Sequence, residues 1–282
     1  MTPESSSPAA SSVTTPLPFG DELAFALETA ALAAELVRAG RGTADVREKE
    51  RADLVTNVDE ASERLIVQRI RERFPEDGVV AEESAAAAVL SGRRWIVDPV
   101  DGTANFVHGH PFVAVSIALH DDAGAAVGVV HAPFLGEVYH ASRGGGAYLD
   151  GEPIHVSRVR ELARSLLATG FPFKSGKGDL DAYMMLVADA IRSSHDVRRA
   201  GSAALDLAFT AAGRVDGYFE TGLAPWDLAA GVLLVTEAGG HVSGWLGDAG
   251  GPVRTGRILA SNGLIHEELR ALAGRWVERL EG

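Results

Sequence analysis

The order of predicted elements changes near residue 166, from successive strands to strands that alternate with helices, and this change constrains the fold more than any other feature of the sequence. Before this point, short apolar runs separated by turn residues predict a series of strands. They lie at 79–81, 95–97, 113–119, 126–131, 137–140 and 147–149. After this point, strands alternate with helices. The predicted strands lie at 196–198, 217–220 and 258–260, and the predicted helices lie at 180–192, 203–212, 227–238 and 264–280.

Two further helices and one turn complete the expected elements. Apolar residues at helical spacing predict helices over 21–37 and 59–74, and Pro75 ends the second. Asp150 and Gly151 predict a hairpin turn after the last early strand. An antiparallel sheet followed by mixed layers is typical of an α+β sandwich with two sheets.

The length of 282 residues suits one large domain with a self-sufficient core. We expect a single domain over 18–282, with an antiparallel-sheet half at about 18–165 and a mixed α/β half at 166–282. Residues 1–17 are rich in Ser, Thr and Pro and are predicted to form a disordered tail.

Composition narrows the classes of function. The chain has no cysteine, which excludes disulfides, thiolate metal ligands and cysteine nucleophiles. No apolar run approaches the roughly 20 residues of a membrane span, and the N-terminus lacks the pattern of a secretory signal. We therefore expect a cytoplasmic protein with no membrane partner. The net charge of −13 repels nucleic acid phosphates, so direct nucleic acid binding is not expected.

The segment with the most chemical content is WIVDPVDGTANF, residues 95–106. Its apolar residues predict a strand that ends at Asp98, where Pro99 starts a turn. Asp101 follows three residues after Asp98, so both carboxylates can converge on one side of this turn.

Gly102 and Thr103 continue the turn. Gly102 leaves room for a close approach, and the amides near both residues are expected to open a helical turn that cradles a phosphate oxygen. Two carboxylates and a turn carbonyl form an all-oxygen environment, which Mg²⁺ prefers. The alternative is an Asx-type turn that caps a helix and binds no ion.

Three other acidic segments have plain structural alternatives when each is taken alone. The glutamates at 82–83 follow a predicted strand, where adjacent glutamates are commonly a solvated edge. Asp59 closes the segment DLVTNVD and fits a helix cap. Asp227 lies in the first turn of a predicted helix, where the helix dipole favours an acid.

Taken together, these segments resemble the signature of the inositol monophosphatase family, from about Phe19 to the C-terminus. The diagnostic pieces are residues 95–106 and WDLAAGVLLVTEAGG at 226–240. The supporting pieces are DLVTNVD at 53–59, EES at 82–84 and GSAA at 201–204. The resemblance implies a layered α/β/α/β/α sandwich, a homodimer and two or three Mg²⁺ ions per site.

The resemblance also implies a ligand set for these ions. Glu82, Asp98 and the carbonyl of Val100 correspond to the ligands of one ion. Asp98, Asp101 and Asp227 correspond to the ligands of a second ion, so Asp98 bridges the two. A third, weaker ion corresponds to a site on Glu82 and water.

The implied activity is hydrolysis of a small phosphorylated polyol, first of all inositol monophosphate. Thr103 and Asp59 resemble the pair that orients and deprotonates a metal-activated water, and Glu82 is counted with them as catalytic. Gly102 and Thr103 are expected to bind the phosphate, and lithium is expected to inhibit.

The resemblance extends to the polyol part of the substrate. Glu220 matches the family position that binds inositol hydroxyls, and a carboxylate that accepts from two vicinal hydroxyls suits a polyol. Gly201, Ser202 and Ala203 match another wall of that pocket. The alternative for Glu220 is a plain acidic residue at the end of a strand.

The sequence departs from the family pattern at a few positions. Ala81 stands where a glycine often precedes the paired glutamates, and Ala104 stands where a second threonine is common. Neither change removes a predicted ligand. Lys49 lies in a charged run near the position of a family lysine, and no role is predicted for it.

Two rival interpretations stay open. Relatives in the wider superfamily act on fructose 1,6-bisphosphate, histidinol phosphate, nucleotide 3′-phosphates or NADP, and the fold does not separate these substrates. Some bacterial relatives are associated with transcription complexes, so a regulatory or RNA-associated scaffold role is the second rival. The intact set of acidic residues favours retained catalysis.

Overall fold

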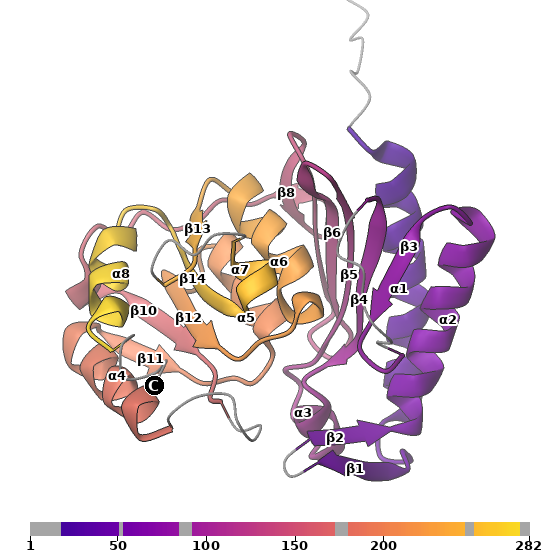
Figure 1. The fold of residues 1–282 in the computed structure, drawn as a ribbon, viewed down its shortest axis with the longest axis horizontal. Coiled ribbons are helices and arrows are strands. Elements are labelled where there is room, and N and C mark those ends of the chain that lie inside the picture. The colour runs from indigo at the N-terminus through magenta and orange to yellow at the C-terminus, as the bar shows by residue number, and fades with distance from the viewer. Residues whose placement is uncertain (1–17, 51–52, 85–91, 173–179, 246–250, 277–282) are drawn as a thin grey trace, which may run out of the picture.

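The computed structural model describes residues 18–50, 53–84, 92–172, 180–245 and 251–276. Within these residues the strands form a seven-stranded sheet, a five-stranded sheet and a two-stranded hairpin. The two larger sheets stand side by side, with helices between them and outside them (Figure 1). The tail predicted over 1–17 lies outside the described residues, and the division into two halves near residue 166 stays a prediction.

The seven-stranded sheet follows chain order from β3 to β9. Its strands are β3 (Gly78–Ala81), β4 (Arg94–Asp101), β5 (Ala114–Asp121), β6 (Gly124–Ala132), β7 (Glu137–Ser142), β8 (Gly146–Leu149) and β9 (Glu152–Pro153). All neighbours are antiparallel except β3 and β4, which are parallel. Asp150 and Gly151 join β8 to β9 with φ values of 51° and 86°, which confirms the predicted hairpin turn.

Two helices cover the outer face of this sheet (Figure 1). They are α1 (Gly20–Gly40) and α2 (Asn57–Arg73). Side chains alternate along a strand, so Trp95 and Val97 of β4 point to these helices and pack in the same core as Ile66 of α2. Both faces of β4 are buried, which explains its continuous apolar sequence.

The five-stranded sheet is mixed and has the order β11-β10-β12-β14-β13. Its strands are β10 (Leu166–Thr169), β11 (Asp196–Arg198), β12 (Gly217–Thr221), β13 (His241–Ser243) and β14 (Arg257–Ser261). Its outer face packs against α4 (Leu180–Ser193) and α8 (His266–Gly274), where Tyr183, Phe219 and Leu269 share one core. A short 3₁₀ turn, η1 (Leu162–Arg164), precedes β10.

Two helices fill the space between the sheets. They are α5 (Ala203–Ala211) and α6 (Pro225–Glu237), and their core includes Ile96 of one sheet and Ala260 of the other. Gly128 lets α6 approach β6 closely, because a β-carbon there would lie 2.8 Å from the Ala230 carbonyl oxygen. The order of layers is therefore α/β/α/β/α, as the resemblance implied. Two short helices complete the fold: α7 (Pro252–Thr255) packs against α6, and α3 (Thr103–Val107) lies beside β2 (Asp53–Thr56) (Figure 1).

The differences from the predicted elements have local causes. β4 does not end at Asp98 but continues to Asp101, and its pairing with β5 shifts register between these two residues. A bulge therefore replaces the predicted turn, and it accommodates Pro99, which has no N–H for the ladder. The hairpin of β1 (Val46–Glu50) and β2 (Asp53–Thr56) was missed because β1 is charged and lacks apolar alternation. The end of the predicted helix over 264–280 lies outside the described residues.

None of the helices that the structure describes combines the length and the apolar character needed to cross a bilayer.

Candidate metal centre and substrate pocket

Asp98 and Asp101 reach the middle layer from the bulge of β4. Ile96 packs in that layer, and Asp98 follows it by two residues. The side chains of Ile96 and Asp98 therefore leave the same face of the strand. The Val100 N–H donates a hydrogen bond of 3.0 Å to Asp98 Oδ1. Asp98 and Asp101 are only 1% and 7% exposed, so their charges are poorly solvated by bulk water.

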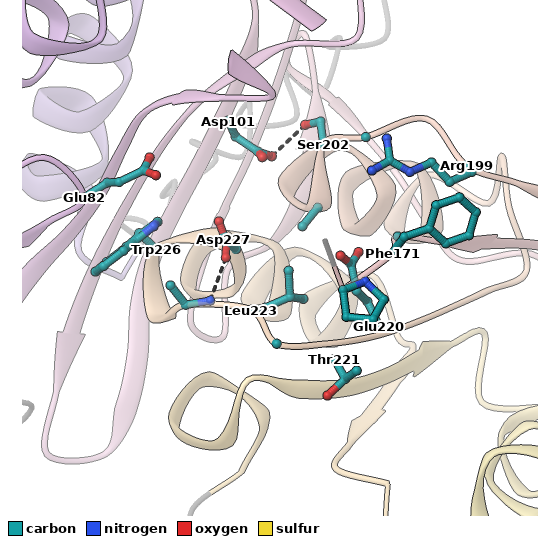
Figure 2. Close-up of a pocket in the computed structure, with 16 residues that line it drawn as sticks. Glu82, Asp101, Phe171, Arg199, Ser202, Glu220, Thr221, Leu223, Trp226 and Asp227 are labelled. Atoms are coloured by element: carbon teal, nitrogen blue, oxygen red, sulfur yellow. Dashed lines mark hydrogen bonds between the residues drawn. The ribbon is translucent and has the colours of Figure 1, made fainter. Parts of the chain in front are cut away.

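Asp227 meets these residues from the first turn of α6. Its Oδ2 accepts a 2.6 Å hydrogen bond from the Ala224 N–H, which satisfies a free amide at the start of the helix. One carboxylate oxygen each from Asp98, Asp101 and Asp227 lies within 4.8 Å of the others. Figure 2 shows Asp101 and Asp227 pointing toward a common space, with Glu82 on its other side.

The electrostatics of this cluster follow from burial and like charge. Burial raises the pKa of Asp98 well above its ordinary value, and the charges of Glu82, Asp101 and Asp227 raise it further. Burial and the charge of Asp227 raise the pKa of Asp101 to about 7. The carboxylates therefore repel one another, and a cation between them relieves that repulsion.

Asp101 is also bound to the start of α5. Its Oδ2 accepts hydrogen bonds from the Ser202 hydroxyl at 2.6 Å and from the Ala204 N–H at 2.8 Å. Ser202 is in turn the N-cap of α5 and accepts from the Leu205 N–H. These contacts use one oxygen of Asp101 and hold its carboxyl group in place.

Asp59 and Thr103 lie together beside this cluster, as predicted from the family pattern. The Thr103 hydroxyl lies 2.9 Å from Asp59 Oδ1 and 3.1 Å from the Val100 carbonyl oxygen. Asp59 is fully buried and accepts from the N–H and hydroxyl of Thr56, with which it forms the capping box of α2. The cap and the contact with Thr103 are thus two roles of one carboxylate. Burial raises the pKa of Asp59, although these hydrogen bonds act in the opposite direction.

The cluster forms one end of a pocket of about 210 Å³. Figure 2 shows Glu220, Arg199 and Phe171 at the other end. Burial raises the pKa of Glu220 to about 8, and the hydrogen bond of 2.6 Å from the Tyr218 hydroxyl acts against this rise. The predicted site residues that line this pocket are Glu82, Asp101, Gly201, Ser202, Ala203, Glu220 and Asp227.

Sequence reasoning missed Asn105, which joins two distant parts of the site. Its side-chain amide donates to the carbonyl oxygens of Phe112 at 2.8 Å and Ala200 at 2.9 Å. The segments that Asn105 joins also approach closely at Gly102, where φ is 93°. A β-carbon there would lie 3.2 Å from the Gly201 carbonyl oxygen, so a glycine is needed. Asn105 belongs to the diagnostic segment, so its position was visible in the sequence, but its partners were not.

Arg199 and Phe171 were also missed. The Arg199 guanidinium carbon lies 5.2 Å from the centre of the Phe171 ring, so the two side chains form a cation–π pair at the pocket wall. The sequence did contain a signal for Arg199, because the arginine pair at 198–199 comes just before Gly201, which was predicted to form the pocket wall.

Lys49, for which no role was predicted, forms an ion pair with Glu83. The Glu83 N–H donates to Glu63 Oε2 at 2.6 Å, and Glu63 lies one turn after Asp59 on α2. These contacts tie α2 to the segment that carries Glu82.

The donor set fits hard divalent cations. It consists of carboxylate oxygens that are crowded and poorly solvated. Burial first and like charges second raise the pKa values of Asp98 and Asp101, and a cation relieves both causes. The layered fold and this cluster define a protein of the metal-binding α+β sandwich class.

Known proteins identify the family within that class. A model of the inositol monophosphatase family matches residues 21–278. Nus factor SuhB of Escherichia coli strain K12 is 44% identical over 247 residues, which cover 85% of this chain and 91% of that protein. The chain therefore belongs to the inositol monophosphatase family, and at the family level it is a metal-dependent phosphatase.

Two solved structures agree with the fold. The extragenic suppressor protein suhB of Bartonella henselae has a TM-score of 0.84 at 36% identity, covering 90% of this chain and 98% of its own. The Thermotoga maritima IMPase has a TM-score of 0.83 at 36% identity, covering 92% of this chain and 98% of its own. The predicted layered sandwich is confirmed by this likeness as well as by the order of layers.

Proposed function

We propose that this chain hydrolyses inositol monophosphate to myo-inositol and phosphate in a Mg²⁺-dependent reaction. The observation that supports the proposal most is the contrast within one small pocket, which has clustered carboxylates at one end and Glu220 at the other. The first end suits cations that bind a phosphate, and the second suits the hydroxyl groups of a polyol.

The ligand assignment follows the family pattern. Glu82, Asp98 and the Val100 carbonyl are proposed to hold one Mg²⁺, and Asp98, Asp101 and Asp227 a second, with a weaker third ion on Glu82. When bound, these ions supply positive charge to the phosphate and the leaving oxygen and make water a better nucleophile. Two observations support this assignment. One oxygen from each of the three aspartates lies within 4.8 Å of the others, and the charge of Glu82 raises the pKa of Asp98.

Thr103 and Asp59 are proposed to handle the attacking water. The Thr103 hydroxyl orients the water and Asp59 takes up its proton, while the amides at Gly102 and Thr103 bind the phosphate. The 2.9 Å contact between Thr103 and Asp59 supports a proton path between them. Burial that raises the pKa of Asp59 makes it a stronger base, which suits this role.

Glu220 is proposed to bind the polyol. Tyr218 donates to Glu220 Oε2, which fixes the carboxyl group, and both Glu220 and Gly170 line the pocket. Gly201, Ser202 and Ala203 are proposed to form the wall beside the ring. Arg199 adds a positive charge at this end of the pocket, where its field lowers the pKa of Glu220.

A panel of phosphomonoesters tests both the chemistry and the substrate. Inositol 1-phosphate, fructose 1,6-bisphosphate, histidinol phosphate, a nucleoside 3′-phosphate, NADP and 4-nitrophenyl phosphate are each assayed with Mg²⁺ and with a chelator. We expect turnover only with the metal and the largest kcat/KM for inositol 1-phosphate. A much larger value for another member would reject the substrate, and absence of Mg²⁺-stimulated turnover on every member would reject the enzyme proposal.

A homodimer and inhibition by lithium are proposed on the same family basis. Light scattering of the purified chain is expected to give twice the monomer mass of 29.6 kDa. Millimolar lithium is expected to lower turnover by occupying a Mg²⁺ position. A monomeric mass, or full activity in lithium, would reject the respective point without touching the reaction.

A second candidate function rests on the likeness to Nus factor SuhB at 44% identity over 85% of this chain. A Nus-factor role would be independent of hydrolysis. In a transcription assay with purified components, the Asp98→Asn variant would then act as well as the wild type. No effect of either protein on transcription would exclude this role.

A further inference from the structure

A second hollow lies away from the catalytic pocket, at the other end of β4. Arg94 opens this strand and lies four residues before Asp98, so the two residues are about 13 Å apart along it. The hollow has a volume of about 470 Å³ and lies between β4, β5, β6, α6 and α7. It shares no lining residue with the catalytic pocket among the described residues, so a ligand bound here leaves that pocket free.

Two polar side chains at its base have atoms without partners. Arg94 and His120 are direct partners in the ladder of β4 and β5, so their side chains lie together on the face toward α6. His120 is only 6% exposed, and its Nε2 has no hydrogen-bond partner within the described residues. The same holds for the buried Nε of Arg94, whose Nη1 donates to the Gly92 carbonyl oxygen at 2.6 Å.

Unsatisfied buried groups of this kind call for an explanation, because each costs stability. Arg94 Nε–H is a donor that needs an acceptor. Burial and the charge of Arg94 lower the pKa of His120 to about 4, so the imidazole is neutral near pH 7 and adds no charge of its own. An acidic group of a ligand that enters the hollow supplies the acceptor that Arg94 lacks.

The charges around the hollow favour an anion. Arg254 of α7 lines the rim, is exposed and forms no ion pair within the described part of the chain. Asp121 also lines the hollow, but Arg143 holds both of its carboxylate oxygens, and Asp122 accepts from the Gly92 N–H at 3.2 Å. The donor to Asp122 is a neutral amide, so Asp122 keeps its charge. Three arginines (Arg94, Arg143 and Arg254) therefore stand against two aspartates around the hollow, which leaves one net positive charge on a chain whose net charge is −13.

The walls are apolar and the size suits a small organic molecule. Ile96, Ala125, Val232, Pro252 and Val253 line the hollow. Ligand sites commonly have about 300–1,000 Å³, apolar walls and a few polar groups that fix orientation. A volume of about 470 Å³ exceeds what one or two bridging waters need.

We propose that this hollow is a second ligand-binding site, which takes a small organic anion with a single acidic group on an apolar body. The acidic group binds Arg94 and Arg254, and the body packs on Ile96, Val232 and Val253. The acidic group is a carboxylate or a phosphonate or phosphate, since each of these binds arginine. The experiment distinguishes the carboxylate from the phosphorus acids by using one probe of each kind.

Benzoate and phenylphosphonate are the two probes, and ligand-observed NMR on the full-length chain is the measurement. A chelator is present throughout and phosphate is left out, so that no metal ion in the catalytic pocket attracts an acidic probe and no other anion competes for the hollow. We expect binding of at least one probe with a Kd on the order of 1 mM, since a ligand of this size has few atoms to bind with. Benzyl alcohol, which has the ring without the charge, is expected not to bind.

Three variants locate the probe. Val253→Trp fills the hollow and is expected to abolish binding, and Arg254→Ala, at an exposed position, is expected to weaken binding about 3- to 5-fold. Arg160→Ala removes an exposed positive charge outside the lining and is expected to change nothing. Failure of both probes to bind the wild type, or equal binding to wild type and Arg254→Ala, would overturn the proposal. Because Arg254→Ala changes only an exposed side chain, this test stands even if Val253→Trp does not fold.

Discussion

The two ends of the catalytic pocket both carry carboxyl groups with raised pKa values, but their partners differ. At the metal end, the pKa of Asp101 is raised to about 7 by burial and by the charge of Asp227. At the other end, which is proposed to bind the polyol and is called the polyol end, burial raises the pKa of Glu220 to about 8, while the Tyr218 hydroxyl donates to its carboxyl group. Hydrogen bonds from the fold hold carboxyl groups at both ends. The ends differ in crowding: three aspartates meet at the metal end and need a cation to relieve their repulsion, whereas Glu220 is a single carboxyl group.

The two ends therefore differ in how they are prepared to bind a ligand. The metal end brings carboxylates from β4 and α6 together and leaves the balance of charge to an external ion. At the polyol end one carboxyl group is fixed in advance, and under the proposed function it is an ordered acceptor for the hydroxyl groups of the polyol. Substitutions at the first end should act on every substrate, and substitutions at the second should act selectively.

The largest expected effect follows from replacing a proposed metal ligand. Asp98→Asn and Asp101→Asn should each lower kcat at least about 100-fold on every phosphomonoester, because each removes a charged ligand. Steady-state kinetics with inositol 1-phosphate and 4-nitrophenyl phosphate measure the loss. Asp21→Asn, at an exposed position on α1, is the matched control and should leave kcat unchanged. Near-normal turnover in both site variants would contradict the ligand assignment.

Glu220→Gln should have a smaller and selective effect. The amide keeps the shape of the side chain but loses the carboxylate that accepts from two hydroxyls, so kcat/KM for inositol 1-phosphate should fall about 10- to 100-fold. For 4-nitrophenyl phosphate, which lacks those hydroxyls, the fall should stay within about 3-fold. Equal losses on the two substrates would show that Glu220 serves the general structure of the site and does not bind the polyol.

Gly170→Ala tests the same end without removing a polar group. Gly170 has no special φ requirement, but a β-carbon there would overlap the Glu220 carboxylate, so the methyl group must displace that side chain. We expect a loss of about 10-fold in kcat/KM for inositol 1-phosphate, with the aryl phosphate nearly unaffected. The comparison of the two substrates in one preparation controls for the amount of folded enzyme. A uniform loss, or none, would show that the displacement of Glu220 has no bearing on polyol binding.

Much of the fold and of the metal end could be predicted from the sequence, because their signals are local. A short continuous apolar run marked β4, and the spacing of Asp98 and Asp101 within one short segment predicted that their carboxylates converge. The approach of Asp227, more than 100 residues away, was predicted only through the family pattern. Neither spacing nor propensity carries information on a contact at that separation.

What could not be predicted depends on which distant surfaces pack together. The hydrogen bond between Ser202 and Asp101 and the bridge from Asn105 to Ala200 join β4 and α3 to the start of α5 across about 100 residues. The second hollow is of the same kind, because Arg94 of β4 and Arg254 of α7 line one space only in the folded chain. A charged residue at the start of a strand or on a short helix looks like an ordinary solvated position in the sequence alone.

The smallest expected effect is on stability, and it separates the two ends by their response to Mg²⁺. In the metal-free chain the folded state raises the pKa of Asp101 from 3.8 to about 7, so it holds a proton more tightly than the unfolded chain does. Folding stability should therefore fall as pH rises from about 4 to about 7, and Glu220, with a pKa of about 8, should contribute the same trend.

Thermal unfolding at pH 5 and pH 8, with and without Mg²⁺, measures this. Mg²⁺ should raise the Tm by several degrees at pH 8 and much less at pH 5, because protonated carboxylates bind the ion poorly. Asp98→Asn should raise the metal-free Tm at pH 8 and reduce the gain from Mg²⁺. Glu220→Gln should also raise the metal-free Tm but keep the full gain, since Glu220 is not a proposed ligand. If both variants lost the Mg²⁺ response equally, the two ends would act as one charged cluster, and the contrast between them would be wrong.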